Sequence, residues 1–230
     1  MATNELRTSR RKLLPEMEGA TARWYDRNRG SASQLAEYRR QAARLAEGLP
    51  AGATVLEVAP GPGYLAVELA RRGPFRVTGL DVSRTFVELA GERARRAGVD
   101  VTFRHGDVHE LPFGADTFDL VVCQAAFKNF TRPVRALDEM HRVLRPGGRA
   151  VIHDLRADVS REEIRREVAR MGLGALSAFW TRAALRMLRR RAITGDRFAR
   201  LAAECAFGGG EVDRDGLVGL EVRLHKPLTG

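Results

Sequence analysis

The sequence TVLEVAPGPGYLA, residues 54–66, contains the change of pattern that decides the fold. The apolar run Thr54–Val58 has the length and composition of a buried strand. A turn of glycine and proline follows, and helical spacing begins at Tyr64. Gly61 and Gly63 allow the backbone to approach a ligand closely and to adopt angles that other residues resist. A helix that begins after them adds free N–H groups and the positive end of its dipole.

Outward from this stretch, short apolar strands alternate with helices. We expect further strands at 75–80, 101–103, 119–123 and 150–153, and helices at 64–72, 84–97 and 134–144. Ser83 is expected to cap the helix at 84–97 and Gly98 to close it. Pro146, Gly147 and Gly148 are expected to form the turn before the last of these strands. This alternation predicts a parallel sheet with helices on both faces.

The pattern changes after residue 156. Helices are expected at 160–171, 175–191 and 196–206, with no strand between them. Two strand-like runs follow, near 210–213 and 217–224. The sequence Asp215-Gly216 between them is a strong hairpin signal. At the other end of the chain, residues 1–30 are polar and predict irregular structure, and a helix is expected from Ser31 or Ser33 to about Glu47.

Length and composition indicate one globular α/β domain. The chain has 230 residues, of which 44% are hydrophobic and 30% charged, a balance that excludes disordered and fibrous classes. It has no run of eighteen apolar residues, so no membrane span is expected. The basic N-terminus has no apolar segment after it and does not resemble a signal peptide. Cys123 and Cys205 cannot form a disulfide framework, so we expect a cytoplasmic protein.

Basic charge is concentrated in one part of the chain. The formal net charge is +10, and residues 156–200 contain twelve arginines and five acids. A nucleic-acid partner is one interpretation of this excess. A solvated helix face is the other, and it is the interpretation we favour for the arginines at 182, 186, 189, 190 and 191.

The glycine turn alone permits two kinds of ligand site. Gly61, Gly63 and Ala66 satisfy the pattern G-x-G-x-x-A, and Asp81 lies twenty residues beyond Gly61. This is the dinucleotide fingerprint of a dehydrogenase, so an NAD-dependent oxidoreductase is one hypothesis. A tight turn without a ligand is another. Asp81 is placed to accept hydrogen bonds from both hydroxyls of a ribose, or to serve as a charge at the start of the next helix. Asp107 is placed to accept from an adenine amino group, or to serve as a turn residue.

The order of several motifs is more specific than any one of them. The series VLEVAPGPGYLAVELA, VTGLDVS, FRHGDVHELPF, FDLVVCQAAFKNF and EMHRVLRPGGRAVIHDLR resembles class I S-adenosylmethionine-dependent methyltransferases, of the small bacterial type grouped with ubiquinone and menaquinone methyltransferases. The resemblance covers about residues 50–156, with weaker support to 225. The L-R-P-G-G turn before the fifth strand and the L-P-F loop after the third separate this family from dehydrogenases.

The resemblance implies a fold and a division of the chain. The fold is Rossmann-like α/β, with a seven-stranded and mostly parallel sheet, helices on both faces and an antiparallel C-terminal strand. A helical substrate lid at about 157–205 is inserted between strands five and six. Residues 1–50 form an N-terminal helical segment that covers the cofactor site, and residues 51–230 form the methyltransferase domain.

The resemblance also assigns residues to S-adenosyl-L-methionine. Glu57 and the turn from Ala59 to Gly63 lie by its methionine part, Asp81 binds the ribose, and Asp107 binds the adenine amino group. The remaining members of the predicted cofactor site are Tyr25, Gly61, Tyr64, Val82, Ser83, Gly106, Val108, Cys123 and Gln124. Val82 and Val108 would enclose the adenine, and Tyr25 would reach back over the cofactor. One departure is that Ala59 stands where the family's first glycine is usual.

Methyl transfer is an in-line displacement, so the enzyme mainly holds the acceptor and excludes water. A base is needed only where the nucleophile loses a proton. His153, at the end of the fifth strand, is the candidate base, although a structural histidine fits the same position. Phe127, Lys128, Phe179 and Trp180 are candidates for the acceptor pocket. No metal-ligand spacing is present, and Cys123 is expected to be a buried thiol rather than a nucleophile.

The favoured hypothesis is methyl transfer to a small-molecule acceptor. An RNA or protein methyltransferase is the alternative that the arginines support. An NAD-dependent oxidoreductase, and a protein that keeps the fold without transferring methyl groups, are the others. The sequence does not identify the acceptor, the methylated atom or the oligomeric state.

Overall fold

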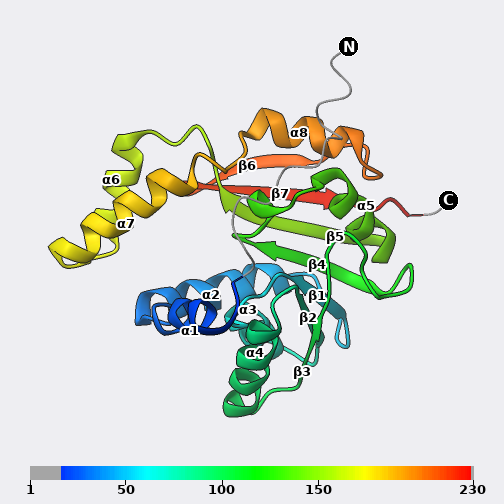
Figure 1. Ribbon diagram of the computed structural model, residues 1–230. Coiled ribbons are helices and arrows are strands. Elements are labelled where there is room, and N and C mark those ends of the chain that lie inside the picture. The colour runs from blue at the N-terminus through cyan, green and yellow to red at the C-terminus, as the bar shows by residue number, and fades with distance from the viewer. Residues whose placement is uncertain (1–16, 229–230) are drawn as a thin grey trace.

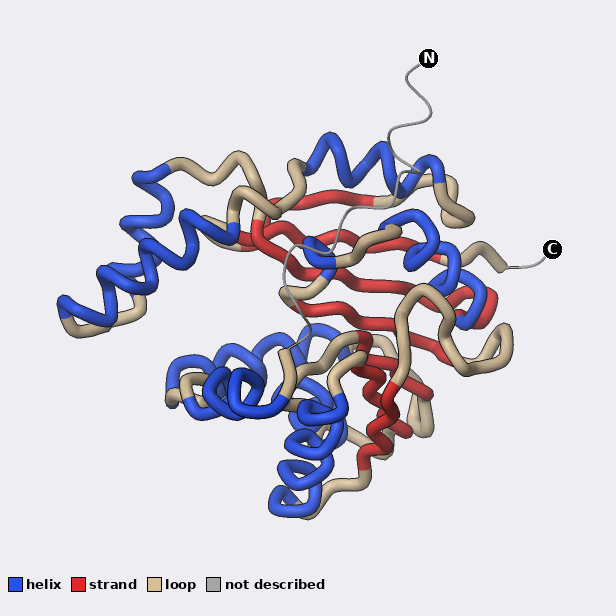
Figure 2. The backbone as a smooth tube through the Cα atoms, in the orientation of Figure 1, coloured by secondary structure: helices blue, strands red, loops and turns tan. Residues whose placement is uncertain are grey.

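The computed structural model describes residues 17–228 and has a seven-stranded sheet at its centre (Figures 1 and 2). The strands lie in the order β3-β2-β1-β4-β5-β7-β6. Their bounds are β1 Thr54–Val58, β2 Arg76–Asp81, β3 Val101–His105, β4 Phe118–Gln124, β5 Leu144–Leu155, β6 Glu211–Asp215 and β7 Gly219–His225. β7 runs antiparallel to both of its neighbours, β5 and β6, whereas the other neighbouring strands pair in parallel. The predicted sheet, with its antiparallel C-terminal strand, is confirmed.

Helices cover both faces of this sheet, as predicted (Figure 1). The helices are α1 Gly19–Arg27, α2 Ala32–Ala46, α3 Tyr64–Ala70, α4 Arg84–Ala97, α5 Pro133–Val143, α6 Arg161–Arg170, α7 Ala175–Leu188 and α8 Gly195–Glu204, with a 3₁₀ turn η1 at Phe127–Asn129. One face packs against α2, α3 and α4, and the other against α5 and α8. No described helix is long and apolar enough to cross a membrane.

The sheet has one hydrophobic cluster on each face, because successive side chains of the central strands point to opposite faces. In β4, Leu120 and Val122 belong to the cluster under α2 and α3, whereas Val121 and Cys123 belong to the cluster under α5 and α8. All four side chains are fully buried. A strand buried on both faces is therefore apolar at nearly every position, which is why these strands could be recognised as short apolar runs.

The N-terminal segment differs from the prediction of irregular structure. Residues 19–27 form α1, and tertiary contacts hold it in place. The Glu18 carboxylate accepts hydrogen bonds from the backbone N–H groups of Arg84 and Thr85, at the start of α4. Asp26 pairs with Arg93 at 2.8 Å. A nine-residue helix is too short to show clear periodicity and depends on such contacts. The part of the predicted segment at 1–16 lies outside the described residues.

Strand β5 is longer than predicted because the Arg145-Pro-Gly-Gly148 stretch belongs to it. Leu144 pairs with Phe118, and after an irregularity in register Arg149 pairs with Leu120. Gly147 has a φ of 79°, which the glycine tolerates without a steric penalty. The extra residues therefore form a bulge within the strand rather than a free turn.

The side chain of Arg145 joins three strands at the end of the sheet where the parallel strands begin. Its guanidinium bonds both carboxylate oxygens of Asp119, at 2.8 and 2.9 Å. Asp119 also accepts from the backbone N–H of Thr54 at 2.7 Å. This network lies at the opposite end of the strands from the glycine turn, so its role is structural.

We therefore expect Asp119→Ala to lower the free energy of unfolding by about 1–3 kcal/mol, because it leaves polar partners unpaired. Urea denaturation measures this. Ligand affinity at the glycine turn should not change, and an altered affinity with unaltered stability would contradict the structural assignment.

Candidate functional site

The turn after β1 has three residues in the left-handed region. The φ angles of Ala59, Gly61 and Gly63 are 54°, 54° and 79°. A Cβ on Gly63 would meet Ala90 at 2.7 Å and the Phe103 ring at 2.9 Å, so this glycine permits close packing of α4. A Cβ on Gly61 would meet nothing within 4 Å. The backbone at Gly61 is thus the part of the turn that is open to a ligand.

Ala59, which departs from the usual glycine, therefore carries backbone strain. A left-handed alanine costs about 1–2 kcal/mol relative to the right-handed form. We expect Ala59→Gly to raise the free energy of unfolding by about 0.5–1 kcal/mol, since relief of strain exceeds the added freedom of the unfolded chain. Ala66→Gly in α3 is the matched control and should lower it by about 1 kcal/mol. Urea denaturation of both variants measures these changes. A change of the same sign in the free energy of unfolding of both variants would contradict the assignment of strain to Ala59.

Asp81 links the end of β2 to this turn. One carboxylate oxygen accepts from the backbone N–H of Gly61 at 2.9 Å, and the other accepts from that of Ser83 at 2.9 Å. Burial raises the pKa of Asp81, while these hydrogen bonds act to lower it. Each oxygen can accept a second hydrogen bond. The carboxylate is thus held beside Gly61 with acceptor capacity left for two hydroxyl groups.

Helix α1 lies against the start of α4, next to Asp81. The Tyr25 ring meets the Phe86 ring edge-on, with centroids 5.8 Å apart. Ser83 donates its hydroxyl hydrogen bond to the Met17 carbonyl at 2.7 Å, and it also caps α4 by accepting from the Phe86 N–H at 3.1 Å. The N-terminal segment is therefore fastened to the same strand end that carries Asp81.

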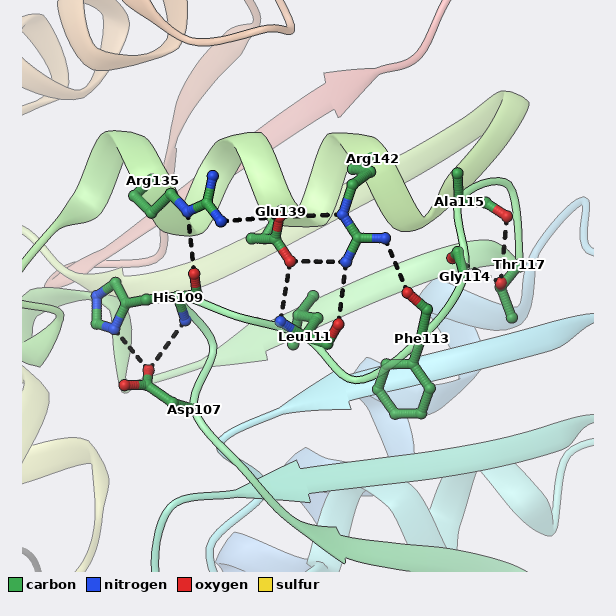
Figure 3. A network of polar contacts seen from close by, with 10 residues as sticks. All are labelled: Asp107, His109, Leu111, Phe113, Gly114, Ala115, Thr117, Arg135, Glu139 and Arg142. Atoms are coloured by element: carbon green, nitrogen blue, oxygen red, sulfur yellow. Dashed lines mark hydrogen bonds and ion pairs between the residues drawn. The ribbon is translucent and has the colours of Figure 1, made fainter.

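Asp107 follows β3 and is held by His109 (Figure 3). One oxygen accepts from the His109 backbone N–H at 2.9 Å and lies 2.6 Å from Nδ1 of the ring. Partial burial acts to raise the pKa of Asp107, but the hydrogen bonds and charge of His109 outweigh it and lower the pKa. Because Asp107 stays half exposed, its other oxygen remains available to a ligand.

The loop that carries Asp107 is tied to α5 by an ion pair between the buried Glu139 carboxylate and the partly exposed Arg142 (Figure 3). Glu139 accepts from the Leu111 N–H at 2.9 Å and pairs with Arg142 at 2.7 Å. Arg142 also donates to the carbonyls of Leu111 and Phe113, at 3.0 and 2.8 Å. These bonds explain how a loop without regular structure keeps a fixed position at the edge of the site.

A row of polar side chains crosses four strands on the face covered by α2. Glu57 on β1 is in register with Val122, two residues before Gln124 on β4. Gln124 is in register with His153 on β5, and His153 with Glu221 on β7. In-register residues of neighbouring strands share a face, so all four lie on one face. They follow one another near the carboxyl ends of β1, β4 and β5.

Three buried atoms of this row have no hydrogen-bond partner among residues 17–228. They are Oε2 of Glu57, Oε1 of Gln124 and Nδ1 of His153. Buried polar groups in folded proteins are nearly always paired, and unpaired ones often mark functional sites where a ligand supplies the partner. Three together, beside the glycine turn, therefore fit a polar ligand. Burial raises the pKa of Glu57 to about 8, and this carboxyl group would ionise most readily beside a cation.

His153 is held by Glu221. Its Nε2 lies 2.6 Å from a Glu221 carboxylate oxygen, and the His153 side chain is only 7% exposed. The hydrogen bond from His153, together with Arg223, lowers the pKa of Glu221 to about 2. Arg223 in turn pairs with Asp213 at 2.5 Å and Glu211 at 2.9 Å on β6. The imidazole is therefore oriented by an ionised carboxylate.

Aromatic and amide side chains of α1 and α2 cover this row. Gln41 bonds Gln124, and Tyr38 stacks on Tyr64 with ring centroids 5.4 Å apart. The Arg29 guanidinium lies 4.9 Å from the Tyr25 centroid. Burial raises the pKa of Tyr38, with the charges of Arg29 and Glu57 also acting on it. The N-terminal segment thus brings one cation and two tyrosines to the site, and α3 contributes the third tyrosine, Tyr64.

Several predicted site residues lie elsewhere. Cys123 points into the core beneath α5, where burial raises its pKa. Phe127 packs on Phe198 in the same core, and the amine of Lys128 pairs with Asp154 at 2.7 Å. Phe179 and Trp180 stand on α7, more than half exposed. The structure thus does not join these four acceptor-pocket candidates into one cavity.

The two valines predicted around adenine differ in burial. Val82 is 38% exposed and Val108 is 7% exposed. Gly106, between β3 and Asp107, donates its N–H to the Asp81 carbonyl at 2.9 Å, so the two strand ends are adjacent. Among residues 17–228, no three His, Cys, Asp or Glu side chains are grouped in a way that could hold a metal ion.

Sequence reasoning missed Glu221, Arg29, Tyr38 and Gln41. A signal for Glu221 existed in its strand, since Leu220, Val222 and Leu224 alternate with Glu221 and Arg223. That alternation places Glu221 on the face opposite the buried leucines. Its pairing with His153, 68 residues away, required the sheet register.

Known proteins resemble this chain in sequence over its central part. The family model described as a methyltransferase domain matches residues 56–152. A demethylmenaquinone methyltransferase of Deinococcus radiodurans is 39% identical over 99 residues, which are 43% of this chain and 41% of that protein. A 27-O-demethylrifamycin SV methyltransferase of Amycolatopsis mediterranei is 36% identical over 115 residues, 48% of this chain and 42% of that protein. The chain thus spans less than half the length of these curated relatives.

The fold is shared over more of the chain. The crystal structure of a SAM-dependent methyltransferase from Aquifex aeolicus superposes with a TM-score of 0.67 and 18% identity, and covers 88% of this chain and 97% of that one. The seven-stranded sheet with its antiparallel C-terminal strand, the glycine turn and the acids after β2 and β3 are the features that the motif series led us to expect. Residues 56–152 therefore match a methyltransferase domain, within a chain that shares the fold of an S-adenosylmethionine-dependent methyltransferase.

Proposed function

We propose that the protein transfers a methyl group from S-adenosylmethionine to a small-molecule acceptor that loses a proton. One observation carries the proposal. Glu57, Gln124 and His153 each have a buried atom without a hydrogen-bond partner among residues 17–228, and these atoms lie in a row that begins beside the glycine turn. A row of this kind fits a ligand that ends in charged and polar groups, with an oriented imidazole at its far side.

We assign each part of the cofactor to residues that lie at or just after the carboxyl end of a parallel strand. Asp81 would hold the ribose and Asp107 the adenine amino group, with Val82 and Val108 on either side of the base. The backbone from Ala59 to Gly63 and the Glu57 carboxylate would hold the methionine part. Bound S-adenosylmethionine supplies an electrophilic methyl group on a cationic sulfur. The other proposed contacts are Tyr25, Tyr64, Ser83, Gly106, Cys123 through its backbone, and Gln124.

His153 is proposed as the base because of its tautomer. Since the ionised Glu221 accepts a hydrogen bond, the neutral imidazole carries its proton on Nε2 and keeps a free lone pair on Nδ1. Nδ1 is one of the buried atoms that have no hydrogen-bond partner among residues 17–228. Nδ1 would remove the acceptor's proton, and Glu221 would stabilise the imidazolium that results.

The names of the relatives suggest an acceptor class. One acts on demethylmenaquinone and the other on an O-demethyl rifamycin, and we propose a similar hydroxylated aromatic acceptor here. Phe127 and Lys128 would shape its pocket by fixing the loop after β4, through the Lys128–Asp154 pair. Phe179 and Trp180 remain candidates for a lid. Because Cys123 and Cys205 are free buried thiols, we also propose a cytoplasmic location.

The function is tested in two steps. Calorimetry with S-adenosylhomocysteine should give saturable binding at one site, whereas NAD should give none. S-adenosylmethionine with a tritiated methyl group should then label an acceptor from a panel of hydroquinones and phenols, and not RNA or protein. Binding of NAD alone would replace the proposal with an oxidoreductase. Labelled RNA or protein would show that the acceptor is a macromolecule rather than a small molecule. Cofactor binding without any transfer would show that the protein keeps the fold and the cofactor site but does not transfer methyl groups.

Asp81→Ala should weaken binding of S-adenosylhomocysteine by about 1–3 kcal/mol, because it removes the acceptor of two buried hydrogen bonds. Calorimetry measures the change. Asp100→Ala, near the start of β3, is the control and should bind as the wild type does. Unchanged affinity in Asp81→Ala would remove Asp81 from the site.

A further inference from the structure

Helix α7 carries an apolar stripe that no described residue covers. Leu176, Phe179, Trp180 and Met187 are 72%, 57%, 64% and 60% exposed, and no residue of this helix is buried. Its Ala178 and Leu185 pack against the small cluster formed by α6. At 100° per residue, the four exposed side chains lie on the side away from Ala178 and Leu185. The stripe is therefore a surface and not part of a core.

The same segment carries positive charge without counterions. Residues 175–191 contain arginines at 182, 186, 189, 190 and 191 and no acid. None of these five makes an ion pair within residues 17–228. The neighbouring α6 differs, because Arg165 and Arg166 both pair with Glu162, at 3.3 and 3.7 Å. Unpaired charge and exposed apolar area thus coincide on the segment 175–191, which is α7 and the three arginines that follow it.

The hairpin of α6 and α7 stands out from the body of the protein (Figures 1 and 2). It is fastened at its base: Arg156 is buried and pairs with Glu163, and Arg189 donates to the Val159 carbonyl at 2.8 Å. A hairpin that is anchored at one end and projects at the other can bring the stripe to a large flat partner without a change in the sheet.

We propose that α7 docks on an anionic lipid bilayer, with the stripe inserted at the interface and the arginines against the headgroups. A helix with aromatic and aliphatic side chains on one side and arginines beside them has the composition of interfacial helices. A second copy of the chain fits less well, because it would bring two uncompensated sets of arginines together. Nucleic acid would leave Leu176 and Met187 without an apolar partner.

The test is co-sedimentation of the full chain with vesicles. Vesicles of equal parts phosphatidylglycerol and phosphatidylcholine should bind the protein, and binding should weaken as salt is raised. Vesicles of phosphatidylcholine alone should bind it far less. The chain has two tryptophans, so Trp24→Phe leaves Trp180 as the only one. In that variant the emission should shift to the blue with anionic vesicles, whereas Trp180→Phe should show no shift.

Variants separate the two contributions. Phe179→Ser with Trp180→Ser should abolish sedimentation. Arg186→Ala with Arg190→Ala should weaken partitioning by about 25-fold, because each arginine near an anionic surface contributes roughly fivefold. Arg165→Ala with Arg166→Ala on α6 removes the same charge and should change partitioning by less than about threefold. All these positions are exposed, and unchanged melting temperatures check that the variants fold.

Several outcomes overturn the proposal. The first is that the protein does not bind anionic vesicles at low salt. The second is that the Phe179→Ser, Trp180→Ser double variant still binds them. RNA binding without vesicle binding would assign the arginines to nucleic acid instead. A dimer that Trp180→Ser dissociates, again without vesicle binding, would assign the stripe to a second copy. None of these measurements depends on methyl transfer, so they are independent of the proposed activity.

Discussion

His153→Gln should lower kcat by about 10²–10⁴-fold, the range that positioned proton transfer contributes. Glutamine keeps the volume and polarity of the side chain but cannot serve as the base. Binding of S-adenosylhomocysteine should be unchanged, because His153 is assigned to the acceptor side. The measurement is the initial rate of tritium transfer to the acceptor identified in the panel. His141→Gln, which removes a histidine packed on Phe207 of the opposite face, should leave the rate unaltered.

Glu221→Gln separates a positioning role from a merely structural one. An amide donates to Nε2 and so favours the opposite tautomer, which places the proton on Nδ1. We expect a loss of kcat with little change in KM, and a nitrogen-15 spectrum in which the proton has moved between the two ring nitrogens. A change in stability without a change of tautomer or rate would show that the contact with His153 serves only the fold.

The second large effect concerns Glu57. Its pKa is about 8 in the folded protein and close to 4.5 in the unfolded chain. Between these values the folded state binds more protons than the unfolded state, so stability falls as pH rises through this window. The loss is on the order of 5 kcal/mol across the window. Glu57→Gln should remove it, and the variant should exceed the wild type in stability above pH 8. Urea denaturation of both proteins across this pH range measures the difference.

The same group should couple cofactor binding to proton release. A cation beside Glu57 favours its ionised form, so S-adenosylmethionine should bind more tightly as pH rises toward 8. Calorimetry in buffers of different ionisation enthalpy would detect the released proton. Glu57→Gln should bind more weakly and release none. Glu68→Gln, a buried carboxyl already paired with Arg71 at 2.9 Å, is the control and should retain the pH dependence of the wild type.

The sequence was sufficient to predict those site residues whose place depends only on their position along a strand. Asp81 and Asp107 follow their strands directly, and parallel strands end at one edge of the sheet, so their proximity to the glycine turn could be predicted. The alternation of strands and helices predicted the layers for the same reason. Helix α1 could not be predicted, because contacts to α4 rather than its own periodicity hold it.

Other features of the site could not be predicted, because they depend on the register of the strands and the orientation of the helices. Whether Cys123 or Gln124 faces the site is decided by one residue of register in β4, and the structure places only the Gln124 side chain there. Phe179 and Trp180 of α7 could be named from the sequence as candidates for the acceptor pocket, but their exposure could not be predicted. Propensity and spacing describe single elements, whereas these properties arise when elements pack together.

The position of β7 between β5 and β6 has a consequence for synthesis of the protein. A chain released only as far as residue 210 has the glycine turn, Asp81 and His153, yet β5 is then an uncovered edge strand. Such edges invite pairing with other chains. Glu221 arrives with the strand that closes this edge. The strand that covers this edge therefore also completes the proposed base, because a nascent chain that ends before residue 221 cannot hold His153 through Glu221.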